Sequence, residues 1–257
     1  MIKKLGYTIF SLFRISFRLN NPLGMINYFF KKPVRLDIKN GLTLLTNQVL
    51  DAIVVKDTII DDDYQVSTIK QPIKTIIDIG AGIGDFTLMV AKKFPQAKIF
   101  AFEPNPEQFF LLKENIKLNN VKNVKNYKIA VGTKKFYLLN LFSFNIHSST
   151  VKTNESKKTI KVKGMRLDKF INGKVDLIKI DCEGAEIDIL KSISNNKMGL
   201  IEKIVIEYHN NIIQNEDKKI LKILNNWPYE ISIRKNNLVP DTGYIFATKK
   251  QFLKRFR

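Results

Sequence analysis

Short, continuous apolar runs recur along the chain from residue 75 onward, and each ends at Gly, Pro or a polar residue. The runs cover residues 75–80, 98–104, 124–132, 175–184 and 202–209. Runs of this length, rich in Ile, Val and Phe, are typical of strands in a sheet that is buried on both faces. Patterns typical of helices lie between them, at residues 85–94, 106–119, 185–193 and 216–226. The alternation predicts an α/β fold with a doubly wound, mostly parallel sheet.

Two further apolar runs, residues 229–236 and 242–250, have no helical pattern between them. They predict an antiparallel hairpin at the C-terminal end of the sheet. Residues 34–70 alternate short apolar runs with turn residues, and Asn40-Gly41 is a strong signal for a hairpin turn. We therefore expect a small β element at residues 34–70, packed on a main domain at residues 71–257.

The first 33 residues combine apolar and basic side chains. Their longest uncharged stretch, residues 20–30, is far shorter than the roughly 20 residues of a membrane-spanning helix. The segment is consistent with a helix packed on the main domain, and also with a basic amphipathic helix that lies peripherally on a membrane surface. The sequence leaves both interpretations of residues 1–33 open.

Composition places the chain among ordinary globular proteins, with 44% hydrophobic and 26% charged residues. Its single cysteine, Cys182, cannot form an internal disulfide, which favours a reducing, cytoplasmic compartment. The unusual property is a net charge of +19, which would attract phosphates, anionic lipids or acidic glycans. Most of these cations are Lys dispersed among Asn and Ile, as an A/T-rich genome would also produce. A functional basic surface and a compositional bias therefore both remain open.

The strongest chemical signal is a glycine-rich turn between the first predicted strand and its helix. Gly80, Gly82 and Gly84 let the backbone turn sharply and approach a ligand closely, and the helix that follows offers free N–H groups. Their spacing differs from the G-x-G-x-x-G of dinucleotide sites. Asp78 and Asp85 flank the turn with negative charge, which would repel a pyrophosphate and attract a cation. The turn therefore favours a sulfonium cofactor with an amino-acid tail over NAD.

A carboxylate ends the second predicted strand. Glu103 is placed where it can accept hydrogen bonds from both hydroxyls of a ribose. Asn105, two residues later, is a candidate for a further amide contact. Both residues support a cofactor that contains a nucleoside.

Polar side chains also lie at the ends of the fourth and fifth predicted strands. They are Asp181, Glu183, Glu207 and His209. Ligands of open α/β sheets bind outside the carboxyl ends of the strands, so these side chains face the reaction. Asp181 and His209 are the candidates for catalysis, while Glu183 and Glu207 are candidates for the substrate side.

Six motifs occur in a fixed order along the chain. They are DIGAGIGDFT (78–87), AFEPNPEQFFLLKENIKLNN (101–120), IAVG (129–132), MRLDKF (165–170), LIKIDCEGAE (177–186) and IVIEYH (204–209). In this order and spacing they resemble the FkbM-type family of S-adenosylmethionine-dependent methyltransferases. The resemblance covers roughly residues 60–250 and leaves out the basic first 33.

The resemblance implies a class I methyltransferase fold, S-adenosylmethionine as cofactor, and O-methylation, commonly of sugar or secondary-metabolite hydroxyls. It implies that the turn from Asp78 to Gly84, including Ala81, holds the methionine moiety. It also implies that Glu103 holds the ribose and that Ala130 and Val131 lie near the adenine.

A hydroxyl acceptor needs a nearby base, because its pKa is too high for spontaneous ionisation. Asp181 and His209 are both candidates, and the sequence does not rank them. No ligand spacing predicts a metal site, although a divalent ion between Asp181 and Glu183 stays open.

We expect the acceptor, a glycan or another small molecule, to be held by the segment 133–165 and the N-terminal extension. The polar stretch at residues 145–150 adds His147 and Ser148 as substrate-side candidates. The sequence carries no signal for the identity of the acceptor or for the oligomeric state.

Two other functions stay open. An RNA methyltransferase would use the basic surface, although the fourth strand lacks the Asp/Asn-Pro-Pro-aromatic pattern of amino-group base methylation. Nucleic acid is therefore the less favoured partner. The second open function is a catalytically inactive cofactor-binding module, which would keep the glycine turn and Glu103.

Overall fold

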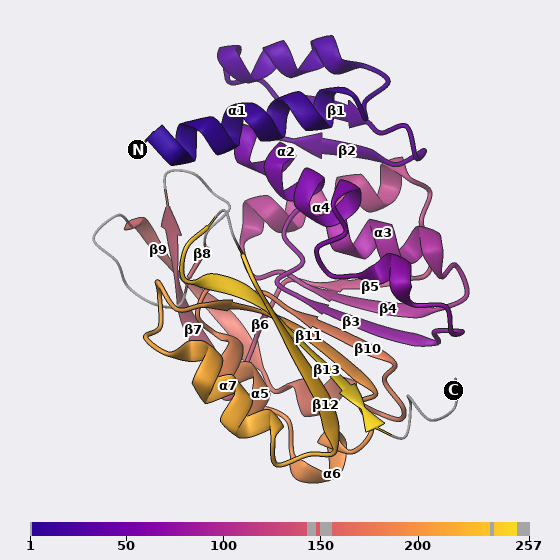
Figure 1. Cartoon of the computed structure of the whole chain (residues 1–257), viewed down its shortest axis with the longest axis vertical. Coiled ribbons are helices and arrows are strands. Elements are labelled where there is room, and N and C mark those ends of the chain that lie inside the picture. Colours follow the sequence, from indigo (N-terminus) through magenta and orange to yellow (C-terminus); the bar gives the residue numbers. More distant parts are fainter. Residues whose placement is uncertain (1, 143–147, 150–155, 237–238, 251–257) are drawn as a thin grey trace.

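The structure is a computed structural model that describes residues 2–142, 148–149, 156–236 and 239–250 (Figure 1). Its central sheet has seven strands in the order β12-β13-β11-β10-β3-β4-β5. The strands are β3 (Thr75–Ile79), β4 (Lys98–Phe102), β5 (Val124–Tyr127), β10 (Leu177–Ile180), β11 (Lys203–His209), β12 (Tyr229–Lys235) and β13 (Thr242–Lys249). The five strands from β11 to β5 are parallel, and β13 runs antiparallel to both of its neighbours. The predicted mostly parallel sheet with an antiparallel C-terminal hairpin is confirmed.

Helices cover both faces of this sheet (Figure 1). They are α3 (Asp85–Lys93), α4 (Pro106–Leu118), α5 (Glu186–Lys191), α6 (Asn195–Met198) and α7 (Glu216–Leu224), with short 3₁₀ turns η3 (Val66–Thr68) and η4 (Leu167–Phe170). Successive strand residues point to opposite faces, so Ile76 of β3 packs with Phe86 of α3, while Ile77 packs with Ile189 of α5. Both faces are therefore apolar, which explains the continuous apolar runs.

The chain leaves β3 in one direction for β4 and β5, and later returns to β10 on the other side of β3. This arrangement creates a switch point between the carboxyl ends of β3 and β10. Ligands of open α/β sheets bind at such points.

The run predicted as one strand at 124–132 forms two strands in different sheets. β5 ends at Tyr127, and β6 (Ala130–Val131) joins a second sheet in the order β6-β9-β7-β8. The other strands of that sheet are β7 (Phe136–Phe142), β8 (Ser148–Ser149) and β9 (Ser156–Met165). Because β5 is the edge of the central sheet, the chain is free to leave it and to pair with the inserted segment.

The expected hairpin forms around Asn40-Gly41, from β1 (Val34–Asp37) and β2 (Thr43–Thr46). The rest of the expected β element is helical, with α2 (Val49–Val55) followed by the π-helical turn η2 (Lys56–Ile60). Asp51 accepts hydrogen bonds from the backbone N–H groups of Asn47 and Gln48, at 2.7 and 3.2 Å. Such a carboxylate in the first turn is a helix-start signal, and it decides between helix and strand in this apolar run.

The N-terminal helix α1 (Ile2–Ser16) packs on this hairpin, followed by the 3₁₀ segment η1 (Pro22–Phe30). Ile15 and Leu19 are buried there, with 0% and 2% exposure. Packing on the domain, one of the two interpretations of residues 1–33, is therefore observed. Every helix within the described residues is too short or too polar to span a lipid bilayer.

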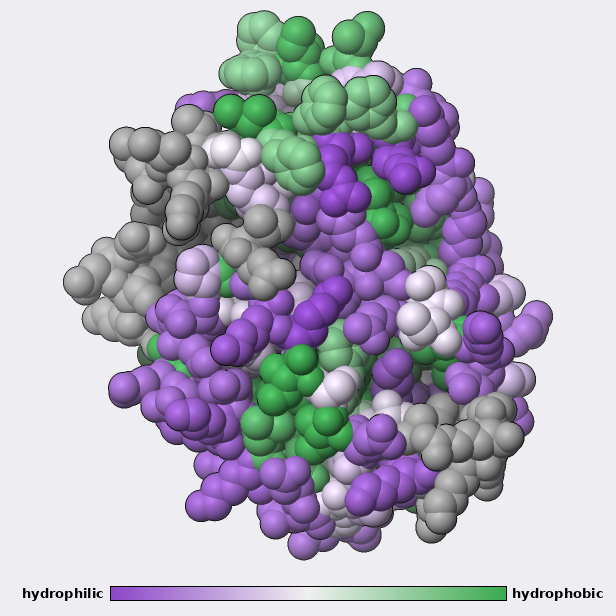
Figure 2. Space-filling view, in the orientation of Figure 1, coloured by the Kyte–Doolittle hydropathy of each residue, from purple (hydrophilic) through white to green (hydrophobic). Residues whose placement is uncertain are grey.

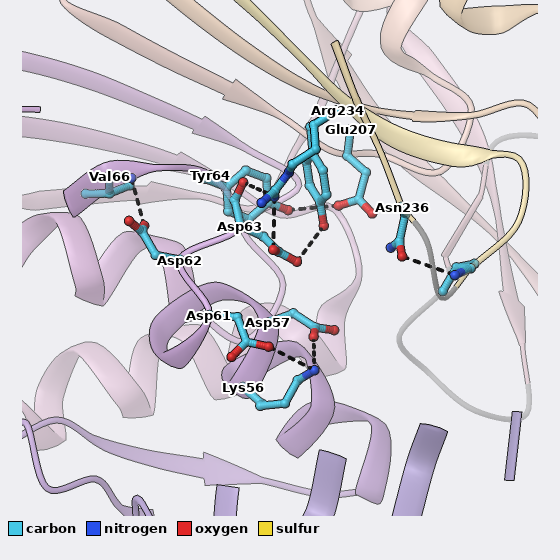
Figure 3. Close-up of polar contacts among 12 residues, drawn as sticks. Lys56, Asp57, Asp61, Asp62, Asp63, Tyr64, Val66, Glu207, Arg234 and Asn236 are labelled. Atoms are coloured by element: carbon cyan, nitrogen blue, oxygen red, sulfur yellow. Dashed lines mark hydrogen bonds and ion pairs between the residues drawn. The ribbon is translucent and has the colours of Figure 1, made fainter. Parts of the chain in front are cut away.

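A buried lysine fastens α1 to the domain (Figure 3). Lys56 is 1% exposed and forms ion pairs with Asp57 and Asp61. The Tyr7 hydroxyl of α1 donates a hydrogen bond to Asp57 at 2.8 Å, and Arg14 of α1 pairs with Asp61 at 2.8 Å. These contacts fix α1 against the cavity described next.

Candidate active site

A cavity of about 1130 Å³ opens at the carboxyl ends of β3, β4, β10 and β11. Its lining includes Gly82 of the glycine turn, Glu103 after β4, Asp181 after β10 and His209 at the end of β11. The N-terminal helix closes one side with Tyr7. The cavity therefore lies at the switch point and brings together the polar strand ends that the sequence indicates.

The glycine turn presents bare backbone to this cavity. At Gly80, φ is +77°, and a Cβ atom would lie 1.7 Å from the carbonyl oxygen of Asp181. At Gly82, φ is +53°, and the nearest atom to an added Cβ is Oε1 of Gln108, 3.9 Å away. Gly80 is therefore required by packing, whereas Gly82 leaves open space that a ligand can fill.

Glu103 is held in place by backbone hydrogen bonds. Its carboxylate accepts one from the Gly82 N–H at 2.9 Å and one from the Asn105 N–H at 2.8 Å. Burial raises the pKa of Glu103 to about 7. A carboxylate has about four lone-pair sites, so two remain for a ligand such as a ribose.

The predicted cofactor residues divide into two groups. Those that line the cavity are Gly80, Gly82, Glu103, Ala130 and Val131. Those that are buried behind its wall are Asp78, Ala81, Gly84 and Asn105. Asp78 accepts a hydrogen bond from the Thr87 hydroxyl at 2.6 Å, and the Asn105 side chain caps α4. The second group thus supports the turn and the helix start, and its contact with a cofactor stays a prediction.

Lys179 is a buried cation between β3 and β10. It is 3% exposed, and its Nζ donates a hydrogen bond to the Gly80 carbonyl at 2.7 Å. The same atom lies 3.5 Å from Asp78 and 3.4 Å from Asp181. Burial alone would lower the pKa of Lys179, but the surrounding carboxylates raise it. Lys179 therefore stays charged and ties the glycine turn to Asp181.

Tyr64 connects Asp181, directly after β10, with Glu207 of β11, and Figure 3 shows its contact with Glu207. Its hydroxyl lies 3.0 Å from Asp181 and 3.0 Å from Glu207, and one proton can serve only one of them at a time. Burial and the nearby Asp181 raise the pKa of Glu207 to about 8. Although burial also acts on Asp181, Lys179 and His209 hold its pKa below the usual value. Asp181 therefore gives up its proton at a lower pH than Glu207 does.

His209 is 5% exposed and has acids on both ring nitrogens. Its Nε2 lies 3.5 Å from Glu183 and 3.9 Å from Asp181, while its Nδ1 lies 3.5 Å from Glu186. Burial lowers the pKa of His209, but Glu183, Glu186 and Glu207 raise it well above the usual value. An imidazole in this position can accept a proton and hold it.

The ligand atoms of Asp181, Glu186 and His209 all lie within 4.8 Å of one another, so these residues could hold a divalent cation. However, both carboxylate oxygens of Glu186 already accept backbone hydrogen bonds, from Cys182 and Gly184 at 2.8 Å each. Each oxygen keeps a further lone pair, which can face the His209 ring or a metal ion. That the site uses no metal stays a prediction.

The substrate-side candidates have different outcomes. Glu183 and Glu207 line the cavity. His147 lies outside the described residues, and Ser148 is described only as part of β8.

Lys179 and Tyr64 lie outside the predicted set of site residues. Lys179 has a signal in the sequence, because it is the charged residue inside the otherwise apolar strand LIKI at 177–180. Tyr64 has none, since its position depends on the neighbouring Asp63, which pairs with Arg234 of β12 at 2.9 Å (Figure 3).

The cavity fits a cationic cofactor. Its lining carries seven acids, Asp51, Asp57, Asp85, Glu103, Asp181, Glu183 and Glu207, and these outnumber the buried basic residues Lys179 and His209. Burial raises the pKa of Asp85 to about 6, and a neighbouring positive charge would favour its ionised form. With the open space at Gly82, these residues suit a sulfonium compound such as S-adenosylmethionine.

Comparison with known proteins agrees with this geometry. The family described as Methyltransferase FkbM domain matches residues 78–231. Methyltransferase 1 of Beauveria bassiana is 31% identical over 177 residues, which cover 59% of this chain and 71% of that protein. Hexuronic acid methyltransferase AglP of Haloferax volcanii is 26% identical over 174 residues, which cover 62% and 65%.

Among solved structures, methyltransferase FkbM from Methylobacillus flagellatus KT aligns with a TM-score of 0.48 at 14% identity, over 93% of this chain and 58% of that one. The family match extends over more than half of the chain and includes the glycine turn, Glu103, Asp181 and His209. The protein is therefore an S-adenosylmethionine-dependent methyltransferase of the FkbM family.

Proposed function

We propose that this enzyme methylates a hydroxyl group of a sugar, a glycan or another small metabolite, with His209 as general base. The observation that carries the proposal is the buried imidazole of His209 at the cavity, between Glu186 on Nδ1 and Glu183 on Nε2. S-adenosylmethionine supplies an electrophilic methyl group when it is bound. The protein must then align the acceptor, exclude water and remove the hydroxyl proton.

The roles of the side chains follow from their contacts. His209 takes the hydroxyl proton on Nε2, which faces Asp181 and Glu183, two acids that line the cavity. Glu186 orients the ring through Nδ1 and stabilises its protonated form. Asp181 is the weaker base, because Lys179 holds its pKa down. We assign Asp181 to accept a hydrogen bond from the acceptor and so to orient it.

A sugar acceptor is supported by two further observations. The Haloferax volcanii relative bears the name of a hexuronic acid methyltransferase. The net charge of +19 would attract an acidic glycan toward the enzyme. We infer that a hydroxylated and negatively charged saccharide is the first class to test.

The test is a methyl-transfer screen with labelled S-adenosylmethionine over glycans, small hydroxylated metabolites and RNA. We expect a saccharide product, and a rate about 10²–10⁴ times lower for His209→Asn, with unchanged cofactor affinity. The bond to the transferred methyl group provides a second criterion. A methyl ether survives mild alkali, whereas a methyl ester does not and needs no base to form. Ester formation, or full activity of His209→Asn, would contradict the proposal.

The net charge also favours an RNA acceptor as a second candidate. The cavity argues against methylation of an RNA base carbon through a cysteine nucleophile. Burial and Glu186 raise the pKa of Cys182, which disfavours its thiolate form. RNA methylation with a steep salt dependence of binding would decide for this candidate. Cofactor binding without transfer to any acceptor would indicate an inactive binding module.

A further inference from the structure

Most of the exposed large apolar side chains of the described residues lie near the N-terminus. Of the 13 exposed large apolar side chains in the described residues, seven belong to α1 and η1 and an eighth, Phe17, directly follows α1, with exposures from 54% to 86%. They form what we call the N-terminal apolar face: Ile9, Phe10, Phe13, Phe17, Leu23, Ile26, Phe29 and Phe30. Figure 2 shows apolar surface gathered over these two elements at the top of the molecule. Contiguous exposed apolar surface marks a site of interaction.

The exposure is a property of a firmly packed helix. On α1, Ser11 and Ile15 are 0% exposed against the domain, while Phe13 on α1 and Phe17 directly after it are 61% and 60% exposed. The helical repeat places these two pairs on opposite sides. Since one side of α1 is already packed, the exposed side is available to a partner.

The charge around the N-terminal apolar face indicates what kind of partner binds there. The first 36 residues contain seven Lys or Arg and no Asp or Glu. Exposed Lys31 and Lys32 directly follow Phe29 and Phe30, and exposed Arg18 follows Phe17. A second copy of the chain would place these cations against like charges, which disfavours a dimer. An anionic lipid surface satisfies both the cations and the aromatic side chains.

We propose that the N-terminal apolar face docks on an anionic membrane, with its aromatic side chains at the acyl boundary and its cations at the headgroups. The same helix lines the cavity with Tyr7 and Thr8. Docking therefore places one wall of the active site next to the lipid surface. This binding does not depend on which acceptor is methylated.

Flotation of the full chain with vesicles tests the proposal. We expect binding to phosphatidylcholine vesicles that contain phosphatidylglycerol, weak binding to phosphatidylcholine alone, and a decrease with added salt. Phe13→Ser/Phe17→Ser should lower binding by about tenfold or more. The matched control is Phe110→Ser on α4, because Phe110 is as exposed as Phe17, at 60%. It should bind like the wild type.

A melting curve shows whether the aromatic variant is folded. If it is not, a charge variant provides a second test of the proposal. Lys31→Glu/Lys32→Glu should weaken binding more than Lys122→Glu/Lys125→Glu, which changes the net charge equally at exposed positions elsewhere. Equal effects of the two charge variants, or no binding of the wild type to either vesicle, would overturn the proposal. Dimerisation that is lost in the aromatic variant, without vesicle binding, would assign the face to a second copy and overturn it too.

Discussion

Nδ1 of His209 lies 3.5 Å from Oε1 of Glu186, whose side chain is 0% exposed. His209 is the last residue of β11, and Glu186 is the first residue of α5. The contact therefore joins a strand end to the helix that follows the neighbouring strand β10. Because both side chains are buried, the imidazole lies beside this carboxylate before any substrate binds.

The acids around His209 should set the pH dependence of the reaction. Negative neighbours stabilise the imidazolium, so they raise the pKa of His209, and a general base works only when it is neutral. On the acid side of the pH profile, kcat/KM should rise with a midpoint above the ordinary histidine pKa. We call this rise the acid limb. Glu183→Gln should move this limb to lower pH, and His209→Asn should remove it. The distant exposed variant Glu230→Gln should leave the limb in place, and an unmoved limb in Glu183→Gln would exclude His209 as the titrating base.

Glu186→Gln separates positioning from charge. It should shift the limb in the same direction as Glu183→Gln and also lower kcat by about 10–100-fold, because the ring loses its orienting carboxylate. KM for the acceptor should change little. A loss that appears only in KM would mean that Glu186 acts on substrate binding instead.

Cofactor affinity should weaken as the pH falls through 7 toward 6. The pKa of Glu103 is raised to about 7 and that of Asp85 to about 6, mainly by burial. A cationic ligand binds more tightly to the ionised acids, so their protonation at lower pH opposes binding and binding at neutral pH releases protons. Calorimetric titration with S-adenosylmethionine over this range measures the effect. The profile should flatten in Glu103→Gln/Asp85→Asn, and a pH-independent affinity of the wild type would refute the assignment.

Substitutions of the two glycines that line the cavity should have different effects. Gly80→Ala places a Cβ atom against the Asp181 carbonyl and should destabilise the fold by about 3 kcal/mol or more. Gly82→Ala meets open space, so it should cost only about 1–2 kcal/mol of backbone strain and lower cofactor affinity by about tenfold or more. Thermal unfolding and calorimetry distinguish the two outcomes. Normal cofactor binding by a folded Gly82→Ala would place the ligand elsewhere.

Lys56→Met should test the attachment of the N-terminal helix. It leaves Asp57 and Asp61 without their buried cation, which should lower the free energy of unfolding by about 3–5 kcal/mol. Urea unfolding measures this change. Lys113→Met, at an exposed position of α4, is the control and should be nearly neutral. Equal stability of the two variants would show that the pairs around Lys56 contribute little.

The sheet was predictable because its signals are local. Continuous apolar runs identified β3, β4, β10 and β11, and the polar residues at their ends identified the rim of the cavity. Residues 49–60 were expected to be β structure, because a nearly continuous apolar run does not distinguish a buried strand from a helix. The decisive feature there is the Asp51 carboxylate on two backbone N–H groups.

The electrostatics of the site could not be predicted in the same way. Tyr64 and Asp181 are separated by 117 positions along the chain, and no local pattern relates them. The preference for His209 over Asp181 as the base likewise depends on Lys179, whose effect on the Asp181 pKa appears only once β3 and β10 lie side by side. Sequence motifs therefore located the candidates, and three-dimensional contacts ranked them.

The excess of acids in the cavity has a consequence for turnover. After transfer, S-adenosylhomocysteine carries a neutral thioether in place of the sulfonium, so the attraction from Asp85, Glu103 and Asp181 weakens at that moment. The spent nucleoside should leave more readily than fresh donor, and product inhibition should be modest. The loss of the positive charge on sulfur would thus favour release of the product and free the cavity for the next donor molecule.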